Sequence, residues 1–163
     1  MAGYEKAQVY PVDDDGRDLS VGIVVGRFNQ EIGEAMLEAC FAELLRLDVA
    51  AENVTIASVP GALEIPLALQ RLADSERFDA LIALGAVIRG ETYHFEIVAG
   101  ESARGLVDLG INHGLCIGNG ILTVENEKQA MARAARDQLD KGGDAARACL
   151  SLITTRARMG VHR

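Results

Sequence analysis

Short apolar runs alternate with amphipathic segments along most of the chain. Four runs, rich in aliphatic and β-branched residues, predict buried strands at residues 21–26, 54–59, 79–85 and 115–124. The segments that follow them carry apolar residues at helical spacing, which predicts helices over residues 31–47, 63–72, 95–109 and 126–139. A last helix is predicted over residues 144–158. The pattern is therefore a strand and a helix repeated four times, ending in tandem helices.

Near-continuous apolar strands separated by helices are typical of a parallel sheet covered on both faces. Right-handed crossovers then give a three-layer α/β/α sandwich around a four-stranded parallel sheet. Asn126 followed by Gln129 fits a capping box at the start of the fourth helix, and the pair Gly142-Gly143 predicts a break before the last one. We expect residues 1–18 to be a flexible segment and residues 19–163 to form a single domain.

Composition narrows the functional classes. The chain has 163 residues, of which 49% are hydrophobic and only 4% aromatic, and its formal net charge is −8. That length suits one domain, and the acidic balance disfavours nucleic-acid binding. The first 20 residues lack the apolar core of a signal peptide, and the longest apolar run is about half of the ~20 residues that a membrane helix needs. We therefore expect a cytoplasmic protein that does not enter a membrane.

The cysteines give no sign of a metal site. Cys40, Cys116 and Cys149 are far apart in the sequence and belong to no CxxC or Cys/His cluster. We expect three free thiols, mostly buried, in a reducing compartment and no structural zinc.

Ligands of open parallel sheets gather beyond the carboxyl ends of the strands, so the residues after each strand are the candidate site. Phe28 follows the first strand and could stack on a planar ligand or cover the end of the sheet. Gly61 and Glu64 follow the second strand. Glu64 suits the positive end of a helix, and with exposed N–H groups it could also bind the polar edge of a ligand.

The third strand is followed by the most informative stretch. The spacing Gly85-x4-Gly90-x-Thr92 resembles a P-loop, but Glu91 stands where the phosphate-binding Lys belongs, which disfavours a nucleoside triphosphate. N–H groups at a helix start and the Thr92 hydroxyl can still hold one phosphate. His94, two residues later, is a candidate general acid or base, and a surface or capping histidine is the alternative.

The fourth strand offers a weaker signal. Gly118, Asn119 and Gly120 nearly match a dinucleotide fingerprint but lack its third glycine, so a dinucleotide site is disfavoured. Arg133, in the helix that follows, is either a solvated helical residue or a clamp for a phosphate.

Four segments of the chain, taken together and in order, resemble the 6,7-dimethyl-8-ribityllumazine synthase family. They are VGIVVGRFNQEI at residues 21–32, VPGALEIPLA at 59–68, ALGAVIRGETYHFEIV at 83–98 and ILTVENEKQAMARA at 121–134. The resemblance implies a flavodoxin-like fold. It also implies the condensation of 5-amino-6-ribitylaminouracil with 3,4-dihydroxy-2-butanone 4-phosphate, which releases phosphate and water in riboflavin biosynthesis. No metal or redox cofactor is implied.

The resemblance also assigns roles to individual residues. His94 would transfer protons, and Glu91, Thr92 and Arg133 would hold the phosphate. The residues that would contact the pyrimidine and the ribityl chain are Phe28, Ala62, Leu63, Glu64, Ala86, Val87, Ile88 and Asn119.

In the resembling family, Asn119 and Arg133 would reach in from a neighbouring subunit of a pentamer, and some members assemble pentamers into a sixty-subunit icosahedral shell. Asn119 and Leu63 stand where aromatic residues are common in the family. Residues 134–143 also depart from the family's usual segment, at the turn that helps to set how pentamers meet. A non-catalytic flavin- or lumazine-binding protein or container on the same fold is the alternative function.

Overall fold

Four parallel strands form the centre of the molecule, in the order β2-β1-β3-β4. The structure is a computed structural model that describes residues 3–160 of the chain. Its elements, in chain order, are β1 (Val21–Gly26), α1 (Gln30–Arg46), η1 (Ala51–Asn53), β2 (Val54–Val59), η2 (Ala62–Glu64), α2 (Ile65–Asp74), β3 (Ala80–Ile88), α3 (His94–His113), β4 (Ile117–Val124), α4 (Glu127–Ala134) and α5 (Lys141–Arg158).

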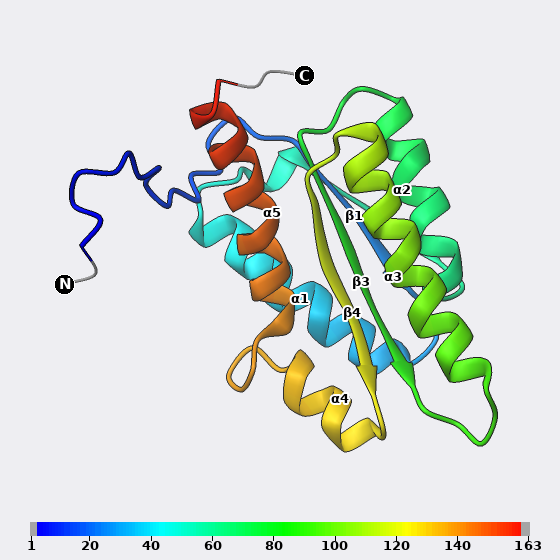
Figure 1. Ribbon diagram of the computed structural model, residues 1–163. Coiled ribbons are helices and arrows are strands. Elements are labelled where there is room, and N and C mark those ends of the chain that lie inside the picture. The colour runs from blue at the N-terminus through cyan, green and yellow to red at the C-terminus, as the bar shows by residue number, and fades with distance from the viewer. Residues whose placement is uncertain (1–2, 161–163) are drawn as a thin grey trace.

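Helices cover both faces of the sheet. Helices α2 and α3 lie on one side and α1, α4 and α5 on the other, as Figure 1 shows. Each face has its own apolar core: Ile65, Leu69 and Leu106 belong to the α2/α3 side, while Met36 and Leu150 belong to the side of α1 and α5. The predicted three-layer α/β/α sandwich is confirmed.

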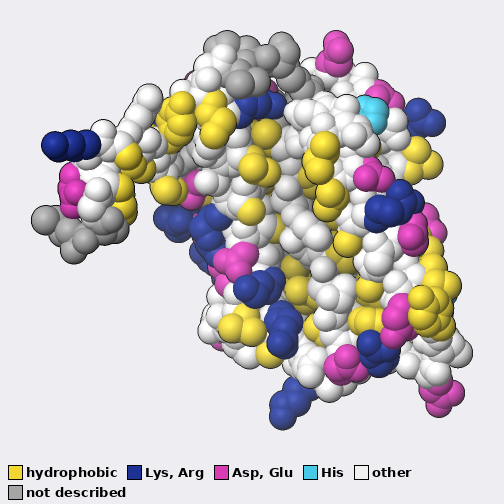
Figure 2. Space-filling view, in the orientation of Figure 1, with side chains coloured by type: hydrophobic (Ala, Val, Ile, Leu, Met, Phe, Trp, Pro, Cys, Tyr) yellow, Lys and Arg dark blue, Asp and Glu magenta, His cyan; other side chains and the backbone are white. Residues whose placement is uncertain are grey.

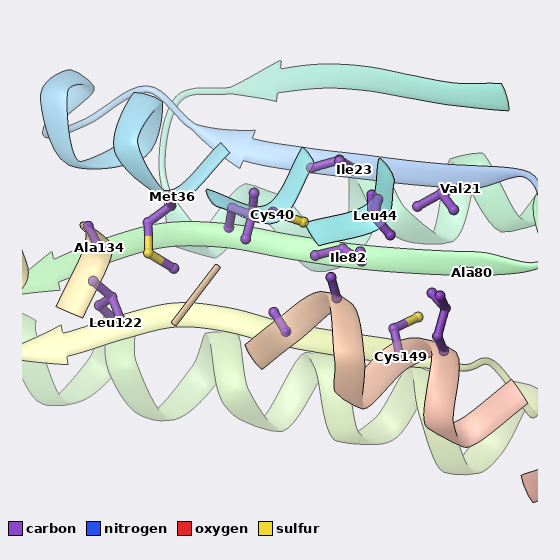
Figure 3. Close-up of a cluster of buried hydrophobic side chains, with 14 of the residues drawn as sticks. Val21, Ile23, Met36, Cys40, Leu44, Ala80, Ile82, Leu122, Ala134 and Cys149 are labelled. Carbon is purple, nitrogen blue, oxygen red and sulfur yellow. The ribbon is translucent and has the colours of Figure 1, made fainter. Parts of the chain in front are cut away.

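The core between α1, α5 and the sheet is built from fully buried side chains. Met36, Cys40 and Leu44 of α1 and Cys149 of α5 all lie against the strands, as Figure 3 shows. Cys116 is buried as well, and within residues 3–160 no disulfide joins the three cysteines. Burial raises the pKa of the Cys40 and Cys149 thiols to about 12, so both thiols are protonated at neutral pH.

Strands β3 and β4 extend beyond the ends of β1 and β2. β3 pairs with β1 only as far as Leu84, whereas its pairing with β4 continues to Ile88 opposite Val124. The third strand was predicted to end at Gly85, but it ends three residues later, at Ile88. Apolar residues 86–88 continue the strand pattern, but the glycine before them hides that continuity.

The C-terminal helices also differ from the prediction. Asn126 caps α4 by accepting a hydrogen bond from the Gln129 backbone N–H at 2.9 Å, as predicted, but α4 ends at Ala134 and not near residue 139. The Gln129 side chain accepts from the Glu125 N–H, one residue earlier than the capping box requires.

Gly142 and Gly143 do not break a helix. Both are buried in the first turn of α5, and a Cβ at Gly142 would overlap the backbone carbonyl oxygen of Met36. Gly142 therefore permits the close approach of α5 to α1.

No helix within residues 3–160 combines the length and the apolar character that a membrane span requires. Several residues ahead of β1 hydrogen-bond to the domain, among them Asp13, Gly16 and Ser20. The Gly16 N–H donates to the Leu47 carbonyl at 2.7 Å, and Arg158 donates to the Asp13 carboxylate at 3.2 Å.

Candidate functional site

The first part of the site lies where β1 and β2 end. The Phe28 N–H donates to the Pro60 carbonyl at 3.0 Å, which holds Phe28 beside the turn after β2. Its side chain is 67% exposed, and a Cβ on Gly61 would lie only 2.6 Å from Phe28 Cδ2. An aromatic ring so exposed does not cover the end of the sheet. Its free face is available for stacking on a planar ligand.

Glu64 has a defined local role. Its carboxylate accepts a hydrogen bond from the Gly61 N–H at 2.9 Å and so closes the turn η2 that leads into α2. The bond engages Oε2 and leaves Oε1 available to a ligand. Ala62 is buried beneath this turn, and Leu63 is 42% exposed on it.

The extension of β3 supplies backbone groups to the same edge. Ala86, Val87 and Ile88 pair with β4 on one side, but β1 has already ended on the other. The Asn29 side chain, on a residue with φ of 58°, donates to the Ala86 carbonyl at 3.4 Å. These three residues are part of a strand and not of a loop after it. Apart from the Ala86 carbonyl, which accepts from Asn29, the backbone groups on the side where β1 has ended have no strand partner and could bond to a ligand.

The loop after β3 leads directly into α3. His94 is the first residue of that helix, and its N–H lies 3.4 Å from the Thr92 hydroxyl oxygen. Glu91, Thr92 and His94 are all exposed. Since the Thr92 oxygen is the acceptor, its proton can be donated elsewhere, and the helix start adds N–H groups suited to an anion. Gly85 lies in β3, so the resemblance of this stretch to a P-loop is one of spacing and not of structure.

Two remaining candidates lie in a separate groove of about 420 Å³. Asn119 and Arg133 both line it, beneath the first turn of α5, and neither Phe28 nor His94 does. Arg133 Nη1 donates to the Gln129 carbonyl on its own helix at 3.0 Å. Asn119 is exposed, and its Oδ1 accepts from the Ile121 N–H at 3.0 Å. Within the described residues of one chain, the candidate site is thus divided into two halves.

Three residues near these halves were not predicted from the sequence. Lys141 lines the groove with Arg133 and pairs with Asp144 at 2.8 Å. Asn29 reaches the extended end of β3, and Arg89 contacts carboxylates on two neighbouring segments. Lys141 was missed because a break was predicted at Gly142-Gly143, so no helix was expected to begin at Lys141.

The near-dinucleotide motif has a structural explanation. Gly118 and Gly120 lie inside β4, and a Cβ on Gly118 would overlap the Ala145 carbonyl oxygen of α5. These glycines permit α5 to pack against the strand and do not form a phosphate loop. Among residues 3–160, no group of three or more His, Cys, Asp or Glu side chains is arranged to hold a metal ion.

Comparison with known proteins gives one consistent result. The model of the family described as 6,7-dimethyl-8-ribityllumazine synthase matches residues 18–157. A relative of that name in Nitrosomonas europaea is 57% identical over 93% of this chain and 90% of the relative. Another, in Methylobacillus flagellatus, is 55% identical over 87% of this chain and 93% of the relative. A third relative, in Azoarcus sp., is 51% identical over 93% of this chain and 95% of the relative.

Proposed function

Because the chain belongs to the 6,7-dimethyl-8-ribityllumazine synthase family, we propose that it condenses 5-amino-6-ribitylaminouracil with 3,4-dihydroxy-2-butanone 4-phosphate. The products are 6,7-dimethyl-8-ribityllumazine, phosphate and water. The observation that carries the proposal is the match over residues 18–157, which includes every candidate site residue. The relatives bear the name of the enzyme, so the comparisons lend no support to a non-catalytic binding protein.

The chemistry needs little from the protein beyond orientation and proton transfer. The amine of the pyrimidine is itself the nucleophile, so no serine or cysteine is required to attack the ketone. Holding two reactants in place can account for a large part of the rate, and one proton shuttle adds to it. His94, exposed on the first turn of α3 and next to Thr92, is our candidate for that shuttle.

The pyrimidine would bind at the ends of β1, β2 and β3. The Phe28 ring would stack on it, and the open backbone of Ala86–Ile88 would meet its polar edge, together with Glu64 Oε1. Leu63 and Ala62 would border the ribityl chain. The exposure of Phe28 and the unpaired side of the β3 extension support this placement.

The phosphate would bind at the start of α3. Its oxygens would accept from the Thr92 hydroxyl and from N–H groups of residues 91–94. Glu91 would contribute its backbone N–H, since its carboxylate repels a phosphate. Arg133 and Lys141 would provide the positive charge, because both line the groove that also carries Asn119.

A complete site would need two chains. The Arg133 groove and the His94 loop are separate in one chain, so we propose that each site combines the loop of one subunit with the groove of the next, in a cytoplasmic pentamer.

Exposed apolar side chains support self-association: Ile97, Val107 and Ile111 on α3 and Leu67 on α2 are each at least 45% exposed. Figure 2 shows hydrophobic side chains among charged ones on the face that carries α3 and α5. Assembly into a sixty-subunit shell is a further possibility that solution mass decides, since the two assemblies differ twelvefold.

The experiment combines turnover with subunit mixing. Purified protein and both substrates should produce the fluorescent lumazine well above the rate in buffer, and riboflavin titration measures binding without turnover. His94→Ala and Arg133→Ala chains should each be impaired, yet their refolded mixture should regain activity, because about one interface in four then pairs two intact halves. Turnover no faster than buffer would refute the function. A mixture no more active than its components would refute the shared site.

A further inference from the structure

The Arg89 side chain joins three segments at the carboxyl edge of the sheet. Its guanidinium donates to the Glu96 carboxylate in the first turn of α3 and pairs through Nε with Glu125, after β4, at 2.9 Å. Its Cζ lies 4.2 Å from the centroid of the Phe95 ring, and its backbone N–H donates to the Val124 carbonyl at 2.9 Å. Arg89 itself directly follows β3, so one side chain connects β3, α3 and the turn between β4 and α4.

These contacts close the loop that carries the proposed phosphate site. Residues 90–93 form the loop, and Arg89 bonds across it to Phe95 and Glu96 on the far side. Within residues 3–160, the only side-chain hydrogen bond of the loop is the long contact between Thr92 and the His94 N–H. A Cβ on Gly90 would meet no atom within 4 Å, and Tyr93 is 73% exposed. Packing therefore contributes little to the conformation of the loop, and Arg89 is its main constraint.

The third contact reaches the start of α4, the helix that carries Arg133. Glu125 lies at the cap of α4, where its N–H donates to the Gln129 side chain at 2.8 Å. Helix α4 carries Arg133, whose side chain donates back to the Gln129 carbonyl. The pair Arg89–Glu125 thus connects the His94 loop to the helix whose Arg133 would serve the neighbouring site.

Arg89 is not suited to bind the phosphate itself. Two carboxylates already neutralise its charge, and its hydrogen bond to Glu96 is the main cause that lowers the pKa of Glu96 and raises that of Arg89. Both groups therefore stay ionised at neutral pH. A lysine has one compact ammonium group and could not span two carboxylates while stacking flat on Phe95.

We propose that Arg89 is a positioning residue, which holds loop 90–93 and His94 in a fixed position against α3 and the end of β4, and so sets the geometry of the part of the phosphate site that this chain supplies. The proposal rests on the proposed function and deepens it. It predicts that Arg89 affects the binding of the phosphate-bearing substrate but not the binding of the pyrimidine. The pyrimidine contacts come from β1, β2 and the β3 extension, and the strand pairing that holds these segments does not involve the Arg89 side chain.

Steady-state kinetics with each substrate varied in turn test the role. In Arg89→Met and Arg89→Lys, the KM for the phosphate-bearing substrate should rise and kcat should fall, each by about 10-fold, because small displacements of catalytic groups are costly. The KM for the pyrimidine should stay within about twofold. Inorganic phosphate, used as a competitive probe, should lose inhibition in parallel. Glu125→Gln removes only the contact to α4 and should give a smaller change in the same direction.

Arg104→Met is the matched control. Arg104 also binds two carboxylates, Glu101 at 2.7 Å and Asp108 at 2.8 Å, but both lie on its own helix α3. It should leave both KM values unchanged. Wild-type kinetics in Arg89→Lys, or an equal rise of both KM values in Arg89→Met, would overturn the positioning role.

Hydrogen exchange keeps this test independent of turnover. Arg89→Met should speed exchange in residues 90–97 and 125–130 without affecting β1, and Arg104→Met should leave residues 90–97 unchanged. A wild-type protein without turnover would refute the proposed function, while the exchange result would still decide whether Arg89 holds the loop. Unchanged exchange in Arg89→Met would overturn the inference whatever the activity. If Arg89→Met does not fold, hydrogen exchange in Glu96→Gln and Glu125→Gln is compared with wild type instead.

Discussion

The carboxylate of Glu64 accepts a hydrogen bond from the Gly61 N–H at 2.9 Å, across the turn that follows β2. One oxygen of the side chain thus stabilises the start of α2, and the other is available to a ligand. A structural and a functional role are therefore combined in one residue, and removing the side chain would affect both.

Two substitutions of Glu64 separate these roles. Glu64→Gln retains an oxygen that can accept from Gly61, so its thermal stability should stay close to wild type, while the loss of charge weakens pyrimidine binding. Glu64→Ala loses the hydrogen bond as well and should be destabilised by about 1 kcal/mol, as for the loss of a helix cap. Thermal unfolding and the pyrimidine KM measure the two effects. Equal destabilisation by both substitutions would show that charge, and not the hydrogen bond, stabilises the turn.

Gly61→Ala should disturb Phe28 without unfolding the protein. The new Cβ would lie 2.6 Å from Phe28 Cδ2, and the exposed ring can move away at little cost to stability. Loss of the stacking position should raise the pyrimidine KM by about 3- to 10-fold, as expected for an aromatic pair. In a Phe28→Ala background, Gly61→Ala should have no further effect on this KM. An additive effect would mean that Gly61 acts on the ligand directly.

His94→Ala should lower kcat by about 10²- to 10⁴-fold, towards the low end because both substrates are reactive. His113→Ala is the matched control, since His113 is the last residue of the same helix and is also exposed. It should keep wild-type kinetics. Stopped-flow or steady-state fluorescence of the product measures both. An unchanged rate in His94→Ala would exclude its role as the proton shuttle.

The layered fold was predictable because its strands are marked by composition. The runs at Val21–Gly26 and Val54–Val59 are bounded by polar residues or proline, and both predicted ranges match the structure. At two of the places where the prediction was wrong, a glycine had two possible meanings. Gly85 continues a strand, and Gly142 allows two helices to approach, but in the sequence each is typical of a break.

The site was predictable only in part, for a related reason. Phe28, Glu64, Thr92 and His94 follow strands directly, so strand order alone brings them to one edge. Lys141 and Arg89 act through contacts between segments distant in sequence, which no local pattern encodes. The separation of Arg133 from His94 likewise depends on which side of β4 each element packs.

The ion pairs of Glu43 make the stability of the protein depend on pH in the acid range. Its side chain is only 5% exposed and pairs with Arg46 at 2.5 Å and with Arg147 of α5 at 2.8 Å. The hydrogen bond from Arg46 is the main cause that lowers the pKa of Glu43, and burial acts against it. A carboxyl with a lowered folded pKa adds stability above its unfolded value of about 4.3, and loses it as the pH falls through the folded value.

The stability difference between wild type and Glu43→Gln should therefore be largest near neutral pH and shrink below about pH 4.3. Urea unfolding at several pH values measures it. Glu101→Gln is the control, because Arg104 also lowers the pKa of Glu101 but that pair is exposed to solvent, and its pH-dependent difference should be much smaller. A Glu43→Gln difference that does not change with pH would contradict the assignment.

Gly142→Ala tests the contact between α1 and α5. The added Cβ would overlap the Met36 carbonyl oxygen and lie 3.1 Å from the Cys40 backbone nitrogen, and backbone atoms inside a helix cannot move aside. We expect destabilisation by at least about 2 kcal/mol, or roughly 4–8 °C in Tm for a domain of this size. At Gly143 a Cβ would instead meet the Asp140 carboxylate, a side chain that can rotate, so Gly143→Ala should cost less. Thermal unfolding of the two variants at equal concentration decides the point. If Gly143→Ala were the more damaging, the close approach of the helices would not be the reason for the paired glycines.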